Sequence, residues 1–464
     1  MKAIKKNGEI LNAVEWLVSE ADDPAACRQC SAMQQIDDLH MQHSAIHVKD
    51  HCKMSDLLFR CLFHALLIVL TFTPEVIFAN IGYVVNELSN NVSVIDTSTN
   101  LIVATISVGD SPQDLVITPD GRLMYVENSI SNDVSVIDTS TNTITVTIPV
   151  GMNPSSVAIT PDGRFVYVVN SDVAGNVSVI DTSTNTIAVT IPVGNSPSQV
   201  AIAPNGLFAY VTNFNSNDVS VIDTSTHLIT STIPVGTSPS SIEVMPNGQF
   251  VYVANVFSPN ISVIDTSTNL IVSTISTITC TGIAFTSNSQ FAYASEALSN
   301  AVAIIDTSTK LITSTIPVGM TPLGLALTPD GQFVYVINEL SNDVSVINAS
   351  TNLIIATVPV GIGPLAVAFM PIPSSPEHLK GHQIKNSFSI VYELVNRLKW
   401  QANSSGSITI GYLIYRNGVQ IATVDASTLE FEDHNVKRHA SNTYSVVAFD
   451  ANGGMSMPST ITVQ

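Results

Sequence analysis

The stretch Ile95-Asp96-Thr97-Ser98-Thr99-Asn100 returns along the chain in nearly the same form. Its acidic residue recurs at intervals of 41 to 43 residues, and in the last copy an asparagine takes its place. The seven positions are Asp96, Asp138, Asp181, Asp223, Asp265, Asp306 and Asn348. A fixed period of this length is typical of a repeat architecture, so the repeat has to be understood before any single residue is assigned a function.

Each repeat unit contains four short runs of alternating apolar residues, separated by residues that favour turns. In the third unit these runs cover residues 155–160, 165–169, 177–180 and 186–192. Proline and glycine stand mainly between the runs, where a missing donor or a positive φ is tolerated. Four antiparallel strands in each of seven units predict an all-β fold, a seven-bladed β-propeller over residues 80–371.

The two ends of the repeat region predict how the ring closes. The first unit lacks an opening strand and starts at residues 82–86, which match a second strand. The last unit ends at residues 364–369, which match an opening strand with nothing to follow. We therefore expect a 3+1 closure, in which one blade takes three strands from the start of the region and one from its end. This closure removes the open sheet edges at the two ends of the array.

The repeated aspartate is interpreted as a turn residue. Its side chain can accept backbone N–H bonds in an Asx-type turn, and the hydroxyl groups that follow can add to them. A turn is needed in every blade, whereas an active site is not. Repetition therefore argues against a catalytic role for these positions.

The charge of the chain limits its partners. The 464 residues carry a formal net charge of -20, and only 12% of them are charged. Between residues 80 and 372 the basic side chains are Arg122, Arg164 and Lys310, against twenty acidic ones. Such a surface repels phosphate backbones, so we expect no nucleic-acid partner. A cation, a basic partner or a neutral glycan remains compatible with it.

The repeat region resembles the YVTN-type propeller repeats of prokaryotic surface-layer and cell-envelope proteins. The motif stands literally at residues 210–213, and Val-Gly-x-x-Pro and Pro-Asp-Gly turns accompany it. Variants of the motif begin at Tyr83, Tyr125, Tyr167, Tyr252, Tyr293 and Tyr335. The resemblance implies a propeller fold. For function it implies a wider range, because such relatives include envelope antigens, binding scaffolds and, more distantly, lactonase-like enzymes.

Residues 1–53 differ from the rest of the chain and are interpreted as a polar leader. They contain Cys27 and Cys30, followed by a group of histidines and Cys52. On a helix His43, His47 and His51 would share one face and could offer ligands to zinc. The spacing matches neither a two-cysteine, two-histidine finger nor a four-cysteine site, so the leader interpretation is favoured.

Residues 54–79 have the pattern of a secretory signal peptide. Arg60 precedes a largely apolar run over residues 61–72, and the small residue Ala79 lies just before the first strand. The run is shorter than the ~20 residues that a membrane span needs. We expect cleavage near Ala79, with Met54 as a candidate start of translation. If the segment is an uncleaved anchor instead, residues 57–78 provide the membrane contact.

The end of the chain is expected to form a second domain. Residues 372–386 are rich in proline and polar residues and predict a linker. Residues 387–464 contain several short strand-like runs and an Asn417-Gly418 hairpin signal, which together predict a small β-sandwich. The order of these runs resembles a fibronectin type III domain. That resemblance implies that Trp400 and Tyr444 are core residues.

Loops on one propeller face vary more between repeats than the turns on the other. Strand alternation places the Pro-Asp-Gly and Asp-Thr-Ser-Thr turns on the same face, and the more variable loops on the opposite one. These variable loops carry four glutamates, Glu87, Glu127, Glu296 and Glu339. Carboxylates with loop carbonyls could hold calcium or another divalent cation. The four glutamates stand at different positions within their loops. We therefore favour the alternative that they are solvated loop acids.

Other catalytic candidates are scarce in the propeller region. It contains one histidine, His227, just after a turn where we expect it to be exposed, and one cysteine, Cys280. A Ser-His-Asp or Cys-His arrangement would require His227 to reach the channel, and histidine-based metal sites usually need more than one. We therefore predict no catalytic residue and no bound cofactor.

Two functions remain open at this point. The first, which we favour, is an exported non-catalytic binding or structural protein of a prokaryotic cell envelope, secreted, periplasmic or on the cell surface. It would use the variable loop face of the propeller to contact a protein or glycan partner. The alternative is a lactonase-like hydrolase with a carboxylate-bound divalent metal at the propeller channel.

Overall fold

The computed structural model describes residues 81–388, 391–403, 406–434, 436–437, 440–450 and 454–463. In these residues the chain is built from β-strands, turns and loops. The polar leader expected at residues 1–53 and the signal segment expected at residues 54–79 lie outside the described ranges. Within those ranges, no helix has the length and apolar character needed to cross a membrane.

Residues 81–370 form the seven four-stranded antiparallel sheets of a β-propeller. Blade one contains β28 (Pro364–Phe369), β1 (Ile81–Asn86), β2 (Asn91–Asp96) and β3 (Leu101–Ser107). Blade two contains β4 (Pro112–Ile117), β5 (Leu123–Asn128), β6 (Asp133–Asp138) and β7 (Thr143–Pro149). Blade three contains β8 (Pro154–Ile159), β9 (Phe165–Asn170), β10 (Asn176–Asp181) and β11 (Thr186–Pro192).

The remaining four blades follow the same order from inside to outside. Blade four contains β12 (Pro197–Ile202), β13 (Phe208–Asn213), β14 (Asp218–Asp223) and β15 (Leu228–Pro234). Blade five contains β16 (Pro239–Val244), β17 (Phe250–Asn255), β18 (Asn260–Asp265) and β19 (Leu270–Ser276). Blade six contains β20 (Cys280–Phe285), β21 (Phe291–Glu296), β22 (Ala301–Asp306) and β23 (Leu311–Pro317). Blade seven contains β24 (Pro322–Leu327), β25 (Phe333–Asn338), β26 (Asp343–Asn348) and β27 (Leu353–Pro359).

The two middle strands of each blade form its core. In β9 the run from Val166 to Val169 is fully buried, and in β10 Val177, Val179 and Ile180 are buried as well. Strands that are covered on both faces need continuous apolar, β-branched runs, and this is the composition that the repeats carry.

The fourth strand of each blade is outermost and largely exposed. In β27, for example, Leu353 is 64% exposed while Val358 is buried. The seven outer strands contain no charged residue, and five of them end in proline. Proline lacks a backbone donor and limits further pairing at an exposed edge.

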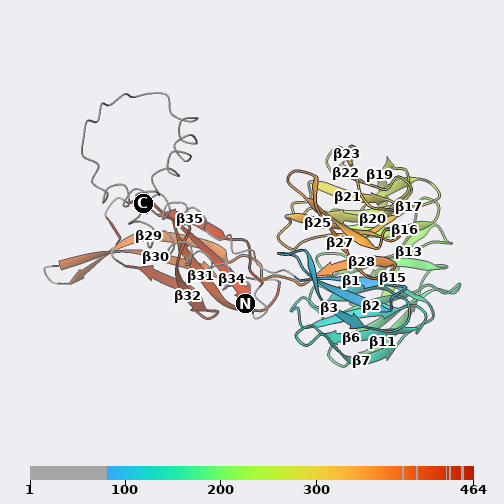
Figure 1. Cartoon of the computed structure of the whole chain (residues 1–464), viewed down its shortest axis with the longest axis horizontal. Helices are drawn as coiled ribbons and strands as arrows, with labels where there is room; N and C mark the ends of the chain where they lie inside the picture. Colours follow the sequence, from blue (N-terminus) through green and yellow to red (C-terminus); the bar gives the residue numbers. More distant parts are fainter. Residues whose placement is uncertain are drawn as a thin grey trace, which may run out of the picture. The chain divides into compact units, whose positions relative to one another are not determined.

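The predicted 3+1 closure is confirmed. Strand β28, from the end of the propeller, pairs with β1 from its start, and the orange and blue strands lie side by side in Figure 1. The pairing places Tyr83 opposite Ala368 and Val84 opposite Val367. One buried cluster then joins Val84 of blade one to Tyr335 and Ile337 of blade seven, so closure buries apolar surface on both sides of the seam.

The tyrosine of the second strand reaches the next blade. Tyr335 donates its hydroxyl hydrogen to Asn100 Oδ1 at 2.7 Å, and Tyr125 donates to Asn185 Oδ1 at the same distance. Both asparagines end an Asp-Thr-Ser-Thr turn and adopt a positive φ. The hydroxyl of Tyr252 is buried and has no such partner, because Lys310 occupies the equivalent turn position.

Substitution Tyr335→Phe is expected to lower the free energy of unfolding by about 1 kcal/mol, because it removes a hydrogen bond between blades and leaves the Asn100 acceptor unpaired. Tyr252→Phe is the matched control and should leave stability nearly unchanged, since its hydroxyl makes no hydrogen bond. Urea denaturation of both variants measures the difference. Equal losses would show that the hydroxyl–asparagine contact contributes nothing.

The C-terminal domain consists of two sheets around a shared core. One contains β29 (Glu377–Phe388), β30 (Val391–Gln401) and β33 (Glu430–Asp433). The other contains β32 (Val419–Asp425), β31 (Thr409–Arg416), β34 (Asn442–Asp450) and β35 (Ser459–Val463). Trp400 and Tyr444 are buried in the core between them, as expected. The turn between β31 and β32 has positive φ at Asn417 and Gly418, which the predicted hairpin requires.

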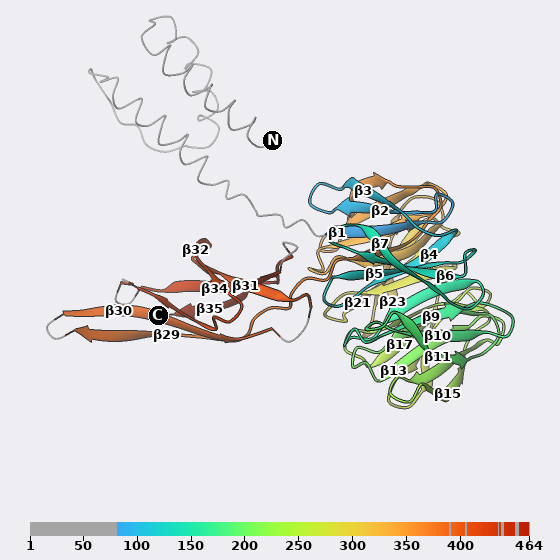
Figure 2. The same cartoon turned by 90° about the horizontal axis from the view of Figure 1, so that it is seen from below.

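The expected linker over residues 372–386 is wrong over most of its length. Strand β29 starts at Glu377 and pairs with β30 as far as Phe388, so the two form the long hairpin seen in Figure 2. The strand escapes recognition because it is an edge strand, in which His378, Lys380 and His382 are exposed. Its composition is therefore as polar as that of a linker.

Candidate functional site

The face with the repeated turns is structural. Asp96 Oδ1 accepts the backbone N–H of Ser98 at 2.9 Å and its hydroxyl at 2.6 Å, as the turn interpretation predicted. Asn348 accepts the same bonds from Ser350. These hydrogen bonds lower the pKa of the equivalent carboxyls, for example that of Asp265. Carboxylates held in this way are stabilised in the ionised form and are poor proton acceptors.

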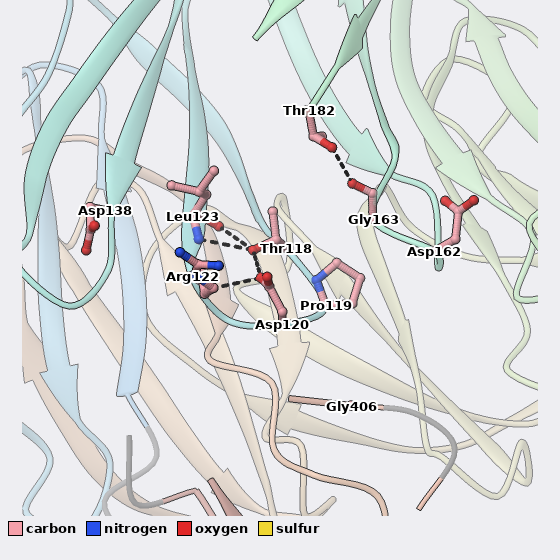
Figure 3. A pocket seen from close by; sticks show the side chains of 10 residues that line it. All are labelled: Thr118, Pro119, Asp120, Arg122, Leu123, Asp138, Asp162, Gly163, Thr182 and Gly406. Atoms are coloured by element: carbon pink, nitrogen blue, oxygen red, sulfur yellow. Dashed lines mark hydrogen bonds between the residues drawn. The ribbon is translucent and has the colours of Figure 1, made fainter. Parts of the chain in front are cut away.

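A cavity of about 430 Å³ lies on this face. Figure 3 shows that side chains in it are hydrogen-bonded to the turns that line it: Thr118 Oγ1 donates to Asp120 Oδ1 at 2.6 Å, and Thr182 Oγ1 donates to the Gly163 carbonyl at 2.7 Å. The second bond joins an Asp-Thr-Ser-Thr turn to a Pro-Asp-Gly turn, which confirms that both lie on one face. We assign no chemistry to this cavity.

The innermost strands of the seven blades form the wall of the central channel. Each contacts the next in the order β4, β8, β12, β16, β20, β24, β28 and back to β4. Their third and fifth positions carry mostly small or uncharged residues. Two carboxyls depart from this pattern, Asp114 in β4 and Glu243 in β16.

Asp114 is held by its own blade and by the next one. Its Oδ1 accepts the Leu115 N–H at 2.8 Å, and its Oδ2 accepts the Ser156 hydroxyl at 3.0 Å and the Val157 N–H at 3.1 Å. Burial nevertheless raises the pKa of Asp114 to about 6, against the lowering effect of these three donors. The carboxyl therefore changes its protonation state close to neutral pH.

Glu243 is electrostatically coupled to Asp114. Burial, and then the charge of Asp114, raise the pKa of Glu243 to about 8. The strands β8 and β12 lie between β4 and β16 in the ring, so this coupling acts across the channel. Two coupled carboxyls titrate as a pair, and in this one Glu243 keeps its proton to higher pH than Asp114 does.

Glu127 adds a third carboxyl beside Asp114. It lies directly opposite Asp114 in the pairing of β5 with β4 and is completely buried. Burial and, to a lesser extent, the charges of Asp114 and Glu87 raise its pKa well above the usual value. The environment thus favours a neutral acid at Glu127, in contrast to the ionised turn aspartates.

The four glutamates considered as metal ligands are not brought together. Glu127 and Glu87 are electrostatic neighbours, and Glu87 Oε1 accepts the Ser111 hydroxyl at 2.9 Å. Glu296 ends β21 in blade six, where it accepts the Ile278 N–H and the Ser299 hydroxyl. Glu339 is half-buried in the loop after β25. In the part of the chain that is described, no three His, Cys, Asp or Glu side chains are grouped to hold a metal ion. Among the described residues, the four glutamates therefore do not form one metal-binding group.

His227 lies on the turn face, away from the channel residues. It is half-buried rather than exposed as expected, because its ring packs edge-on against Phe165 and its Nδ1 lies 2.9 Å from the Tyr167 hydroxyl. Burial lowers the pKa of His227. Cys280 is also buried, which raises its thiol pKa to about 12, so it is not a ready nucleophile.

Because the folded-state pKa of His227 is lowered, the unfolded chain binds more protons as the pH falls below about 6.5, and the contribution of this residue to stability is lost. His227→Asn places there the residue that blade three carries at Asn185, which accepts the same tyrosine bond without titrating. The variant should lose less stability than the parent between pH 7.5 and pH 5.5, measured by urea denaturation. Identical losses would contradict a role for His227.

Comparisons with known proteins support the propeller. A family model described as a YNCE-like β-propeller matches residues 52–212, and one described as a seven-bladed lactonase β-propeller matches residues 175–280. No curated protein matches the chain.

Solved structures share the fold at low identity. A structure of hydrazine synthase from Kuenenia stuttgartiensis is 23% identical with a TM-score of 0.53, covering 57% of this chain and 91% of that one. A protein of unknown function from Desulfotomaculum acetoxidans is 20% identical with a TM-score of 0.57, covering 62% and 98%. A putative 6-phosphogluconolactonase from Bacteroides uniformis is 18% identical with a TM-score of 0.54, covering 63% and 99%. At these identities the likeness shows the fold alone.

The comparisons correct the expected function. The expectation of a non-catalytic binding or structural protein of the cell envelope is contradicted by the match of residues 175–280 to a lactonase family, which points to enzyme-like propellers. Asp114 and Glu243 were not among the candidate residues predicted from the loops. The sequence does distinguish these two carboxyls, because the innermost strands of the other blades carry uncharged residues at both the third and the fifth position. The chain is a β-propeller repeat protein with a region similar to the seven-bladed lactonases.

Proposed function

We propose that this protein is a lactonase-like hydrolase whose acid–base pair is Asp114 and Glu243. The observation that carries the proposal is the coupled placement of these carboxyls across the channel, with pKa values raised to about 6 and about 8. Acid–base catalysts work best when their pKa values lie near the working pH. The match of residues 175–280 to the lactonase family, which includes Glu243, supports the same reaction class.

The pair supplies both proton transfers that lactone hydrolysis needs. Ionised Asp114 takes a proton from a water molecule while the oxygen of that water attacks the lactone carbonyl carbon. Protonated Glu243 gives its proton to the ring oxygen as the carbon–oxygen bond breaks, and the product is a hydroxy acid. Afterwards Asp114 is protonated and Glu243 ionised, and one proton returns to Glu243 through the solvent. Opposite walls of one channel place the base and the acid on either side of the substrate.

Asp114→Asn and Glu243→Gln are each expected to lower kcat for lactone hydrolysis by about 10²- to 10⁴-fold, the usual contribution of a positioned acid or base. In the parent protein kcat/KM should peak between pH ~6 and ~8, because only there does the pair hold one proton. Acid release in a pH-stat measures both.

Asp265→Asn is the control for these variants. Asp265 lies in one of the repeated Asp-Thr-Ser-Thr turns, outside the channel, and Asn348 already fills the equivalent place in blade seven. Its activity should equal that of the parent protein. The proposal is refuted if no lactone is hydrolysed, or if both channel variants keep full activity while remaining folded.

Chelation separates this mechanism from a metal-dependent one. Because the described residues offer no group of three metal ligands, dialysis against EDTA is expected to leave kcat unchanged. A loss of turnover that added calcium or another divalent ion restores would contradict the metal-free mechanism and favour a site built on Glu87 or its neighbours.

A further inference from the structure

Each blade of the propeller ends in an outer strand whose outward edge pairs with no other strand in the described part of the chain. These strands are β3, β7, β11, β15, β19, β23 and β27, and each stands last in its sheet. An unpaired edge presents free N–H and C=O groups, so it can add a strand from another chain. The residue that ends each strand decides how open its edge is.

The last residue of an outer strand points its backbone N–H away from the sheet. After β3, the N–H of Val108 donates inward to the Asn90 carbonyl at 3.1 Å. The backbone groups of successive residues in a strand point to opposite sides, so the N–H of Ser107 points outward. The same inward bond, from the Thr277 N–H, follows β19, so the N–H of Ser276 also points outward.

Proline occupies this last position in five of the seven outer strands. Strands β7, β11, β15, β23 and β27 end at Pro149, Pro192, Pro234, Pro317 and Pro359. Proline has no N–H, so these five edges lack the outward donor. In contrast, β3 ends at Ser107 and β19 at Ser276, and both serines are exposed. We call the edges of β3 and β19 the open edges.

The segment that is available for pairing lies after a bulge. The register of β3 with β2, and that of β19 with β18, shifts after the third residue of the outer strand. A bulge bends a strand, so the regular part of each open edge covers residues 104–107 in β3 and 273–276 in β19. This part contains the serine with the outward N–H.

Exposed apolar side chains precede the open edges. Leu101 and Val103 of β3 are 62% and 56% exposed. Leu270 and Val272 of β19 are 63% and 51% exposed. A strand from another molecule that pairs with either edge would cover apolar surface as well as satisfy free backbone groups.

The partner that fits these edges is a second copy of the chain. Strands β3 and β19 differ only at their fourth residue, which is Ala104 in one and Ser273 in the other, so each copy offers the edge that another copy needs. Neither strand carries a charge, whereas the propeller has twenty acidic and three basic side chains in its other parts. Two copies that meet edge to edge therefore avoid the repulsion that acidic loops and turns would cause.

The two open edges lie on different sides of the ring. Strand β3 belongs to blade one and β19 to blade five. Blades six and seven lie between them in one direction, and blades two to four in the other. A molecule with two separate pairing edges binds two neighbours, so the assembly grows as a linear row instead of closing as a dimer.

From these observations we infer that copies of this protein associate through antiparallel pairing of their open edges. Ser107 and Ser276 supply the outward N–H groups that the other five outer strands lack. When two identical edges pair about a two-fold axis, each contributes its serine N–H once, so the contact contains this hydrogen bond twice. The inference is independent of the proposed lactonase function.

The test replaces each serine with the residue that the other outer strands carry. Ser107→Pro and Ser276→Pro each remove one outward donor, and the fold accepts proline at the equivalent place in five blades. Sedimentation velocity of the full chain over a series of protein concentrations measures association. The mean mass of the parent should rise with concentration beyond that of a dimer. Each single variant should stop at dimers, and the double variant should raise Kd at least about tenfold, because two hydrogen bonds are lost from each contact.

Two further variants separate the backbone donor from other effects. The double variant Ser107→Ala/Ser276→Ala is the matched control, since alanine changes the side chain and keeps the N–H, and it should associate like the parent. Pro359→Ser is placed in the double proline variant. It gives β27, which has the exposed side chains Leu353 and Ile355, the donor that this strand lacks, and it should restore association.

A parent protein that stays monomeric at every concentration overturns the inference. Association that the double proline variant retains also overturns it and assigns the contact to another surface. Association that the alanine control loses assigns the contact to the serine hydroxyl groups, and a Pro359→Ser variant that stays monomeric contradicts the role of the donor. Circular dichroism of each variant shows whether the propeller is folded, which separates a loss of pairing from a loss of structure.

Discussion

The structure depends on closing a ring of sheets, each of which has two apolar faces. A blade such as β8 to β11 buries its middle strands completely only because a neighbour covers each side. An array with free ends would leave one such face uncovered at each end. Pairing β28 with β1 closes the ring and covers both of these faces. The buried cluster that includes Val84 and Tyr335 forms at this seam. The channel and its mouth exist because of this closure.

The fold could be predicted from the sequence because the same four-strand repeat unit occurs seven times. In a single repeat unit, short alternating apolar runs do not determine the strand boundaries. When the seven units are aligned, they determine the number of strands, the turns and the way the two ends join. Where repetition stops, prediction weakens. Strand β29 has no second copy to compare with, and its exposed polar residues have the composition of a linker.

The candidate site was harder to predict, since its members are close only in the closed ring. Asp114 and Glu243 are more than a hundred residues apart and belong to blades that do not adjoin. Glu127 and Glu87 were recognised as acids of the variable face, although the burial of Glu127 was not. Glu296 replaces an asparagine that ends the second strand in the other blades, and its bond to Ile278 gives it a structural role.

Carboxyls of one chemical kind thus have opposite properties in this propeller. In the turns, nearby N–H and hydroxyl donors meet an exposed carboxylate and lower its pKa, as at Asp306. In the channel, burial exceeds the effect of the donors, so the pKa of Asp114 rises although it accepts three hydrogen bonds. Burial therefore decides which acids of a repeat protein are available for proton transfer.

The 3+1 closure also sets the order in which the protein can be completed during synthesis. Blades two to seven are each encoded by one continuous segment, so each has all its strands once that segment has left the ribosome. Blade one has three strands at the outset and lacks the fourth until residue 369 has been made. The inner edge of β1 stays open throughout that interval. The last propeller strand to be translated is the one that shuts the ring, and it does so just before the C-terminal domain follows.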